Sequence, residues 1–172
     1  SKQILKDGDI ISIDIGANYK GYHGDCARTW PCGNVKSDRL KLIEVTEQSF
    51  FEGLKYAHPG NRLSDISHAI EMYAKKFNYG VVRDFTGHGV GSKLHEDPAV
   101  PNYGKEGMGP VLRKGMTLAI EPMINMGTYK VKILADGWTT ITSDHSPSAH
   151  YENSIVITDN GYEILTKIKE ND

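Results

Sequence analysis

The chain has little of what several large classes of protein require. Its two cysteines, Cys26 and Cys32, are too few for a disulfide framework or a zinc ribbon, so we expect thiols with a structural role. No apolar run approaches the roughly 20 residues that a membrane-spanning helix needs. The net charge is only −2 and the basic residues are scattered, which disfavours direct binding to nucleic acid or to an anionic membrane.

Two common catalytic signatures are also absent. The glycine-rich stretch ThrGlyHisGlyValGly (86–91) is not closed by a Lys-Ser/Thr pair, so it is not a phosphate-binding P-loop. The spacing of His88 and His95 excludes the His-Glu-x-x-His helix of many zinc peptidases. Glycines around a histidine let a backbone approach a ligand closely, which favours a site in this region.

The composition fits one globular domain. Of the 172 residues, 38% are apolar and 24% are charged, which is enough apolar material for a sizeable core. No internal repeat, low-complexity run or linker divides the sequence. We therefore expect residues 1–172 to form a single domain, and the scarcity of cysteine favours a cytoplasmic location.

Five potential metal ligands stand in stretches that are otherwise apolar or rich in glycine. They are Asp14, Asp25, His88, Glu121 and Glu152. A buried carboxylate is costly unless something pairs with it. Four carboxylates and one imidazole that converge on one place would need a cation, and we expect two.

The first two acids are predicted to face each other across a hairpin. Residues 9–16 alternate between apolar and polar side chains, as in a half-buried strand, and residues 22–30 form the return strand. A turn centred just after Tyr19 places Asp14 opposite Asp25, with Cβ atoms roughly 5 Å apart. Two such like charges repel, which favours a bound cation or a shared proton. The alternative is a bulge that sets the two acids on different faces.

Two amphipathic helices are predicted to follow the hairpin as scaffold. Ser37 is a candidate N-cap for the first, whose apolar residues recur at helical spacing as far as Leu54. HisProGlyAsn (58–61) ends this helix, and the second begins at about Ser64.

The second half of the chain is predicted to consist mainly of loops and strands. Loops hold the histidines at 86–91 and 95–98. Residues 115–124 form one buried strand, which carries Glu121. Hairpins are expected within 128–143 and within 151–165, the latter across an AspAsnGly turn.

These residue types indicate a site with two metal ions. Carboxylate oxygens with one imidazole suit manganese, iron(II), cobalt or zinc, and the lack of thiolate ligands argues against a structural zinc. Two metals bridged by carboxylates can activate water, so hydrolysis of an amide or a phosphoester is expected. The alternative without metal, an ion pair of Glu121 with Arg28 or Arg113, does not explain the similar settings of the other acids.

Several motifs together resemble the methionine aminopeptidases of type I. ThrGlyHisGlyValGly and HisGluAspPro are followed by GlyMetThrLeuAlaIleGluProMet and TyrGluAsnSerIleValIleThr, in the order of that family. AspGlyAspIleIleSerIleAspIleGly and GlyTyrHisGlyAspCysAlaArgThrTrp also match, so the resemblance covers essentially the whole chain. It implies the α+β pita-bread fold, a curved antiparallel sheet with helices on its outer face.

The resemblance also implies a role for each candidate ligand. Asp14 would chelate one metal ion, while Asp25 and Glu152 would bridge both. His88 and Glu121 would complete the ligands of the second ion. The two ions would be divalent cobalt, manganese, iron, zinc or nickel.

Four residues would act on the substrate. Glu121 would take the proton from the attacking, metal-bridging water. His95 would contact the substrate carbonyl and the developing oxyanion. Trp138 would line the pocket for the methionine side chain, as would Leu94, which stands where relatives often carry an aromatic residue.

The implied reaction removes the initiator methionine from nascent polypeptides whose second residue is small. The free amine of the substrate would bind near a metal, which restricts cleavage to the N-terminus. Nascent N-termini would be the partners, with transient contact to the ribosome and no direct contact with nucleic acid or membrane. We expect a monomer.

The chain departs from the family at its start. Family members carry a further N-terminal segment that supplies part of the methionine pocket and a proton-donating histidine. His23 stands where the family assigns no such role. We expect the C-terminal, metal-binding portion of a longer enzyme, which binds metal, turns over slowly alone and exposes apolar surface that the further segment would cover.

Two other functions are compatible with this fold. Prolidases and Xaa-Pro aminopeptidases usually carry ProGly after the glutamate that corresponds to Glu121, whereas this chain has Pro122-Met123. A non-catalytic binding module would typically have lost metal ligands, whereas all five candidates are present here.

Overall fold

The computed structural model describes residues 4–167, which form two helices and twelve strands. The helices are α1 (Ser37–Leu54) and α2 (Leu63–Lys75). The strands are β1 (Ile10–Tyr19), β2 (Tyr22–Pro31), β3 (Gly80–Val81), β4 (Gly87–Gly89), β5 (Glu96–Val100), β6 (Thr117–Ile120), β7 (Met123–Asn125), β8 (Val131–Ile133), β9 (Thr140–Thr142), β10 (Ser148–His150), β11 (Asn153–Ile157) and β12 (Tyr162–Ile164).

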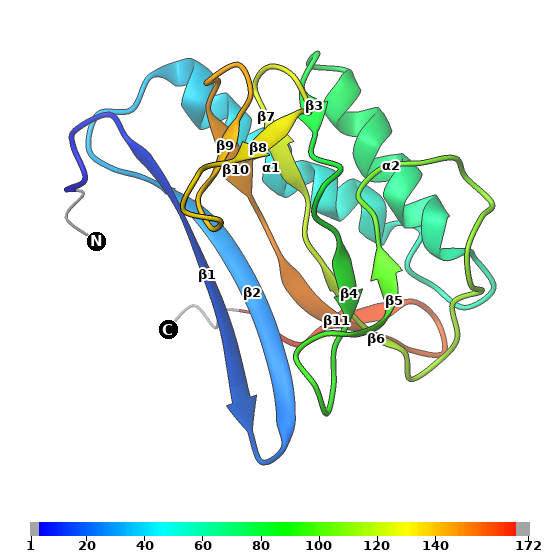
Figure 1. Ribbon diagram of the computed structural model, residues 1–172. Coiled ribbons are helices and arrows are strands. Elements are labelled where there is room, and N and C mark those ends of the chain that lie inside the picture. The colour runs from blue at the N-terminus through cyan, green and yellow to red at the C-terminus, as the bar shows by residue number, and fades with distance from the viewer. Residues whose placement is uncertain (1–3, 168–172) are drawn as a thin grey trace.

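The strands form antiparallel sheets that the two helices cover on one face. The five-stranded sheet has the order β12-β11-β6-β4-β5 and the three-stranded sheet the order β10-β7-β3. Helix α1 contacts β7 and β10, and α2 contacts β3 and β5. Figure 1 shows the helices side by side on one side of these strands, with the long β1–β2 hairpin running along the other. The predicted antiparallel α+β architecture with helices on the outer face is confirmed.

The apolar core lies between the helices and the sheets, in two clusters. The larger one joins both helices to the five-stranded sheet, and the smaller one joins them to the three-stranded sheet. Fully buried residues of the larger cluster include Phe50, Ile66, Ile70, Leu118 and Ile155. The helices are therefore scaffold, as predicted, although Ser37 is the first helical residue and Lys36 precedes it as a cap without a side-chain bond.

The register of the first hairpin differs from the prediction by two residues. Asp14 pairs with Ala27, and Asp25 pairs with Gly16. The turn is centred between Lys20 and Gly21, which both have positive φ angles of 52° and 87°. A two-residue turn of this kind matches the twist of the strands, and glycine adopts it without strain. Because the shift is two residues, Asp14 and Asp25 remain on the same face, as diagonal neighbours.

The apolar face of β1 is not half-buried as the alternation predicted. Ile13 is 45% exposed and Ile15 is 59% exposed. The polar face carries the contacts instead, since the Ser12 and Thr29 hydroxyls are hydrogen-bonded at 2.8 Å. Apolar side chains are therefore exposed along this strand.

The two histidine stretches that were predicted as loops contain strands. β4 lies between β6 and β5, so the centre of ThrGlyHisGlyValGly is inside the five-stranded sheet. A Cβ atom at Gly87 would lie 2.3 Å from the Ala119 carbonyl oxygen, and one at Gly89 would lie 2.3 Å from that of Asp97. These glycines therefore serve close approach of neighbouring strands. β5 tolerates Pro98 because it is at the sheet edge, where a missing N–H is harmless.

The buried strand predicted over 115–124 is interrupted at the candidate ligand it carries. β6 ends at Ile120 and β7 begins at Met123 in a different sheet. Pro122 cannot donate to a ladder, which separates the two strands and leaves Glu121 at the break. The two later hairpins are confirmed, with β8 pairing to β9 and β11 pairing to β12.

Candidate active site

The first hairpin and the C-terminal strands meet through a short antiparallel junction. Ala27 and Glu152 exchange backbone hydrogen bonds, with N···O distances of 2.9 and 3.4 Å. Ala27 also pairs with Asp14 across the hairpin. Ala27, which is small and fully buried, therefore lies between Asp14 and Glu152. Its small side chain leaves room for the two carboxylates to converge.

On both sides of this junction, side-chain hydroxyls make hydrogen bonds to backbone groups in place of backbone–backbone hydrogen bonds. Ser154 accepts a hydrogen bond from the Asp25 N–H at 2.9 Å and donates to the Asp25 carbonyl oxygen at 3.0 Å. Thr29 does the same for the backbone of His150, at 2.8 and 2.9 Å. The backbones that carry Asp25 and Glu152 are thus held in fixed register.

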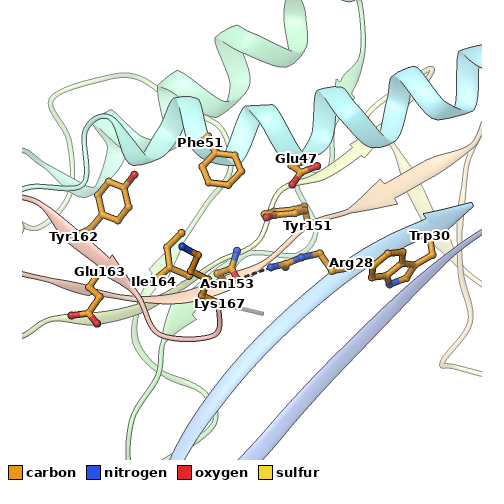
Figure 2. Close-up of a pocket in the computed structure, with 10 residues that line it drawn as sticks. All are labelled: Arg28, Trp30, Glu47, Phe51, Tyr151, Asn153, Tyr162, Glu163, Ile164 and Lys167. Carbon is orange, nitrogen blue, oxygen red and sulfur yellow. Dashed lines mark hydrogen bonds between the residues drawn. The ribbon is translucent and has the colours of Figure 1, made fainter. Parts of the chain in front are cut away.

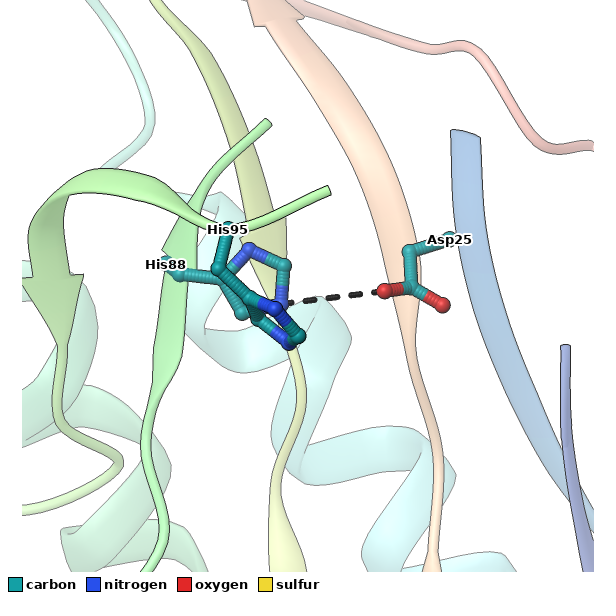
Figure 3. A group of neighbouring side chains, drawn as sticks. All are labelled: Asp25, His88 and His95. Carbon is teal, nitrogen blue, oxygen red and sulfur yellow. Dashed lines mark ion pairs between the residues drawn. The ribbon is translucent and has the colours of Figure 1, made fainter. Parts of the chain in front are cut away.

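The imidazole of His88 is oriented for metal binding. Its Nδ1 atom lies 2.8 Å from the Gly89 carbonyl oxygen, and only a protonated Nδ1 can make that hydrogen bond. Nε2 then keeps its lone pair, which is the usual arrangement for a histidine ligand. Nε2 lies 3.7 Å from Asp25 Oδ2 and 3.5 Å from Glu121 Oε1. Figure 3 shows His88 pointing toward Asp25 from the strand on the other side of the site.

Glu121 is held from several directions at the break between β6 and β7. Its carbonyl oxygen accepts a hydrogen bond from Asn102 Nδ2 at 3.0 Å. Its side chain is 12% exposed and lies between two imidazoles, with Oε2 at 3.6 Å from His150 Nε2. The predicted alternative pairing with Arg28 is wrong, because that guanidinium donates to the Ala27 and Glu152 carbonyl oxygens and to Asn153 Oδ1.

The structure brings all five candidate ligands into one place. One group with ligand atoms within 4.8 Å of one another consists of Asp14, Asp25 and Glu152. A second such group consists of His88, Glu121 and Glu152. The two groups share Glu152, which lies between two adjacent positions that a cation can occupy.

Burial and mutual repulsion raise the pKa values of two of these acids. Burial, together with the charges of Glu121, Asp25 and Asp14, raises the pKa of Glu152 to about 9. Burial is also the largest cause that raises the pKa of Asp14. A cluster of acids that cannot all be ionised is a poor arrangement by itself, but divalent cations would neutralise it. The donor set and the His88 tautomer fit such ions.

The predicted substrate-binding residues lie at different distances from this cluster. His95 belongs to a third group with Asp25 and His88, and its ring centroid is 4.3 Å from that of His88. Leu94 lies against β1, since a Cβ atom at Gly16 would be 3.0 Å from its Cδ1. Trp138 is 88% exposed in the connection between β8 and β9. Their roles toward substrate stay predictions.

His150 is a site residue that the sequence analysis missed. Its side chain is 12% exposed, and it lies next to Glu121. It is also close enough to Asp14 to oppose part of the rise that burial causes in the pKa of that acid. The available signal was its position two residues before Glu152, on the same side of an extended segment. The prediction treated the segment only as the carrier of one ligand.

A cavity lies on the face of β2 opposite to the one that carries Asp25. It has a volume of about 1010 Å³ and is lined by residues of β2, α1, β12 and the start of β11 (Figure 2). Arg28 and Trp30 face it, whereas Asp25 and Ala27 alternate to the other face of β2. Arg28 lies 4.0 Å from the centroid of the Tyr151 ring. Arg28, which lines this cavity, donates a hydrogen bond to the carbonyl oxygen of Glu152.

A metal-dependent peptidase is the class that this fold and site define, and comparison with known proteins agrees. The model of metallopeptidase family M24 matches residues 1–159. The chain belongs to this family, whose members use divalent metal ions. None of the helices in residues 4–167 is both long and apolar enough to cross a bilayer.

Within family M24 the chain groups with the methionine aminopeptidases. Methionine aminopeptidase 1 of Bacillus subtilis is 56% identical over 166 residues, which cover 96% of this chain and 67% of that protein. The methionine aminopeptidase of Clostridium perfringens is 57% identical over 165 residues, covering 96% of this chain and 66% of that protein. The chain thus spans about two thirds of the length of these relatives.

Solved structures give the same grouping. The methionine aminopeptidase of Thermotoga maritima matches with a TM-score of 0.95 at 48% identity, covering 97% of this chain and 67% of that one. The prolidase of Pyrococcus furiosus matches with a TM-score of 0.77 at 26% identity, covering 99% of this chain and 44% of that one. The pita-bread fold is shared with both, and the methionine aminopeptidase is the better match.

Proposed function

We propose that the chain hydrolyses the peptide bond after an N-terminal methionine, using two divalent metal ions. The observation that carries this proposal is the convergence of five predicted ligands in two groups that share Glu152. Asp14 would hold one ion and His88 the other, with carboxylates shared between them. Two such ions, when bound, make water a better nucleophile and stabilise negative charge on a carbonyl oxygen.

The chain's own side chains would handle the proton and the carbonyl group. Glu121 is the candidate base for the attacking water, since Oε1 faces the ligand group from one side. His95 is exposed at the edge of the site next to His88, where its ring can donate to the substrate carbonyl oxygen as negative charge develops. Leu94 and Trp138 are the candidates for contact with the methionine side chain.

The substrate class follows from the relatives with which the chain groups. We infer an initiator methionine followed by a small residue, presented by a nascent polypeptide. A transient contact with the ribosome, a monomeric state, a cytoplasmic location and a single catalytic domain over residues 1–172 are further expectations of this proposal.

Peptide cleavage tests the proposal directly. The chain, loaded in turn with Mn²⁺, Co²⁺ or Fe²⁺, should release free methionine from a Met-Gly peptide. It should release none from the N-acetylated peptide, which lacks a free amine. An Ala-Pro peptide tests the prolidase alternative, and the Bacillus subtilis relative serves as the positive control.

The variant Glu121→Gln separates catalysis from a binding role. It keeps the size of the side chain but removes the proposed base, so methionine release should fall by more than about 100-fold. A binding module would keep its partner affinity in this variant. Preferential cleavage of the Ala-Pro peptide, or no bound metal after loading, would contradict the proposal.

A further inference from the structure

His150 is a largely buried imidazole, 12% exposed, that lies in the site but has no role among the five predicted ligands. Its Nε2 atom is buried and has no hydrogen-bond partner within 3.5 Å in the described part of the chain. Nε2 lies 3.6 Å from Glu121 Oε2, which is just beyond a normal hydrogen bond. A small rotation of either side chain would close this distance.

The backbones on both sides of this contact are fixed. His150 is clamped by Thr29 through two hydrogen bonds, and Thr29 is in turn bonded to Ser12. His150 also pairs with Met123, only two residues after Glu121. The relative placement of Nε2 and the Glu121 carboxylate is therefore set by the sheet.

The two imidazoles that flank Glu121 cannot have the same role. His88 Nδ1 donates to the Gly89 carbonyl oxygen, so its Nε2 carries a lone pair and faces Glu121 Oε1. A lone pair does not donate to a carboxylate. The donor to Glu121 must come from the other side, where His150 Nε2 faces Oε2.

We propose that His150 is a positioning residue, whose Nε2–H donates to Glu121 Oε2 and turns Oε1 toward His88 and the metal position. The inference rests on the proposed function, since Glu121 is there both a ligand and the base. Partners of this kind fix the orientation of a metal-ligating carboxylate, and their loss costs about 10- to 100-fold in metal affinity or activity.

Three substitutions at this position test the inference. His150→Gln places an amide nitrogen close to where Nε2 lies, so it should keep metal affinity and kcat near wild type. His150→Asn carries its amide nitrogen nearer the backbone and His150→Leu has no donor, so both should lose about 10- to 100-fold in Mn²⁺ affinity and in kcat. KM for the Met-Gly peptide should change little. His58→Gln, in an exposed connection, is the matched control.

Isothermal titration with Mn²⁺ gives a readout that is independent of turnover. Equal affinities for wild type and the Leu variant would overturn the inference, and so would a Gln variant as impaired as the Leu variant. The absorption spectrum of the Co²⁺-loaded protein should be the same in wild type and the Gln variant. A spectrum showing loss of a nitrogen ligand would also overturn it, because His150 would then bind metal itself.

The same variants and the wild-type chain also distinguish a folding defect, or a failure of the proposed function, from a failure of this inference. If His150→Leu does not fold, the comparison of the Gln and Asn variants decides alone. A wild-type chain that binds no Mn²⁺ contradicts the proposed function. A wild-type chain that binds Mn²⁺ without releasing methionine contradicts the peptidase assignment, while the metal affinities still decide the role of His150.

Discussion

Asp14 and Asp25 lie diagonally across the first hairpin, because Asp14 pairs with Ala27 and Asp25 pairs with Gly16. Same-face neighbours at this diagonal are about 7–8 Å apart at Cα, closer at Cβ, and carboxylates can bridge such a gap through a cation. The glycine opposite Asp25 leaves space on that side, which Leu94 partly fills.

Removal of one of these carboxylates should weaken metal binding. Asp25→Asn keeps the shape of the side chain but removes its charge, and we expect Mn²⁺ affinity to fall by more than about 100-fold. Titration calorimetry measures this directly. The control is Asp84→Asn, at an exposed position on a different segment. Unchanged affinity in Asp25→Asn would show that this residue is not a ligand.

The stability of the metal-free chain should fall as pH rises. Burial and neighbouring acids raise the folded-state pKa of Glu152 from 4.5 to about 9, so between these values the folded chain holds a proton that the unfolded chain has released. Stability is therefore fully present below about pH 4.5 and declines toward pH 9, by about 1.4 kcal/mol per pH unit for this group. The raised pKa of Asp14 acts in the same direction.

Urea unfolding of the chelator-treated chain at pH 6 and pH 8 measures this decline. Glu152→Gln has no proton to lose at this position, so its stability should depend less on pH over the same range. A metal-free chain that is more stable at pH 8 than at pH 6 would contradict the prediction.

Arg28 should support Glu152 from behind. Its guanidinium donates to the Glu152 carbonyl oxygen and, at 2.8 Å, to Asn153 Oδ1, while also covering the Tyr151 ring. Arg28→Met keeps much of the volume but leaves these acceptors without the donor. We expect a loss of about 1–3 kcal/mol in the free energy of unfolding.

The metal affinity of Arg28→Met should fall as well, because Glu152 loses its anchor. The control is Arg113→Met, since Arg113 is an exposed residue on a different segment. A stability change without any change in metal affinity would show that Arg28 has only a structural role.

Gly89 should not tolerate a side chain. A Cβ atom there would lie 2.3 Å from the Asp97 carbonyl oxygen, so β4 and β5 would have to separate. We expect Gly89→Ala to destabilise the chain by about 1–3 kcal/mol and to displace His88. Gly24→Ala is the matched control, because its Cβ would meet only the Thr166 methyl group at an ordinary 3.4 Å. Equal melting temperatures for the two variants would contradict this prediction.

Sequence alone predicted most of what depends on local pattern. Period-two alternation indicated the first hairpin, and helical spacing indicated both helices. Because side chains alternate between the two faces of a strand, the two-residue error in register still left Asp14 and Asp25 on the same face. The five candidate ligands were chosen because acids in apolar or glycine-rich surroundings are costly, and the structure brings their ligand atoms together.

What was missed depends on tertiary contact. The register of the first hairpin depends on which two residues of the turn take positive φ, and these are Lys20 and Gly21. The sequence pattern placed the centre of the turn one residue too early. The glycine-rich segment 86–91 was predicted as a loop because glycine is uncommon in strands. Here glycine is required, since the neighbouring strands approach too closely to leave room for a Cβ atom. His150 was missed because its significance arises from Glu121, which is distant in sequence and adjacent only in the folded sheet.

The separation of the ligands along the chain also has a consequence for biosynthesis. Asp14 leaves the ribosome more than a hundred residues before Glu152, yet both belong to the same group of candidate metal ligands. The hairpin can form early, but no ion can be captured at full strength until β11 has been translated and docked beside β2. The growing chain therefore lacks a complete set of candidate ligands until its own sheet is assembled.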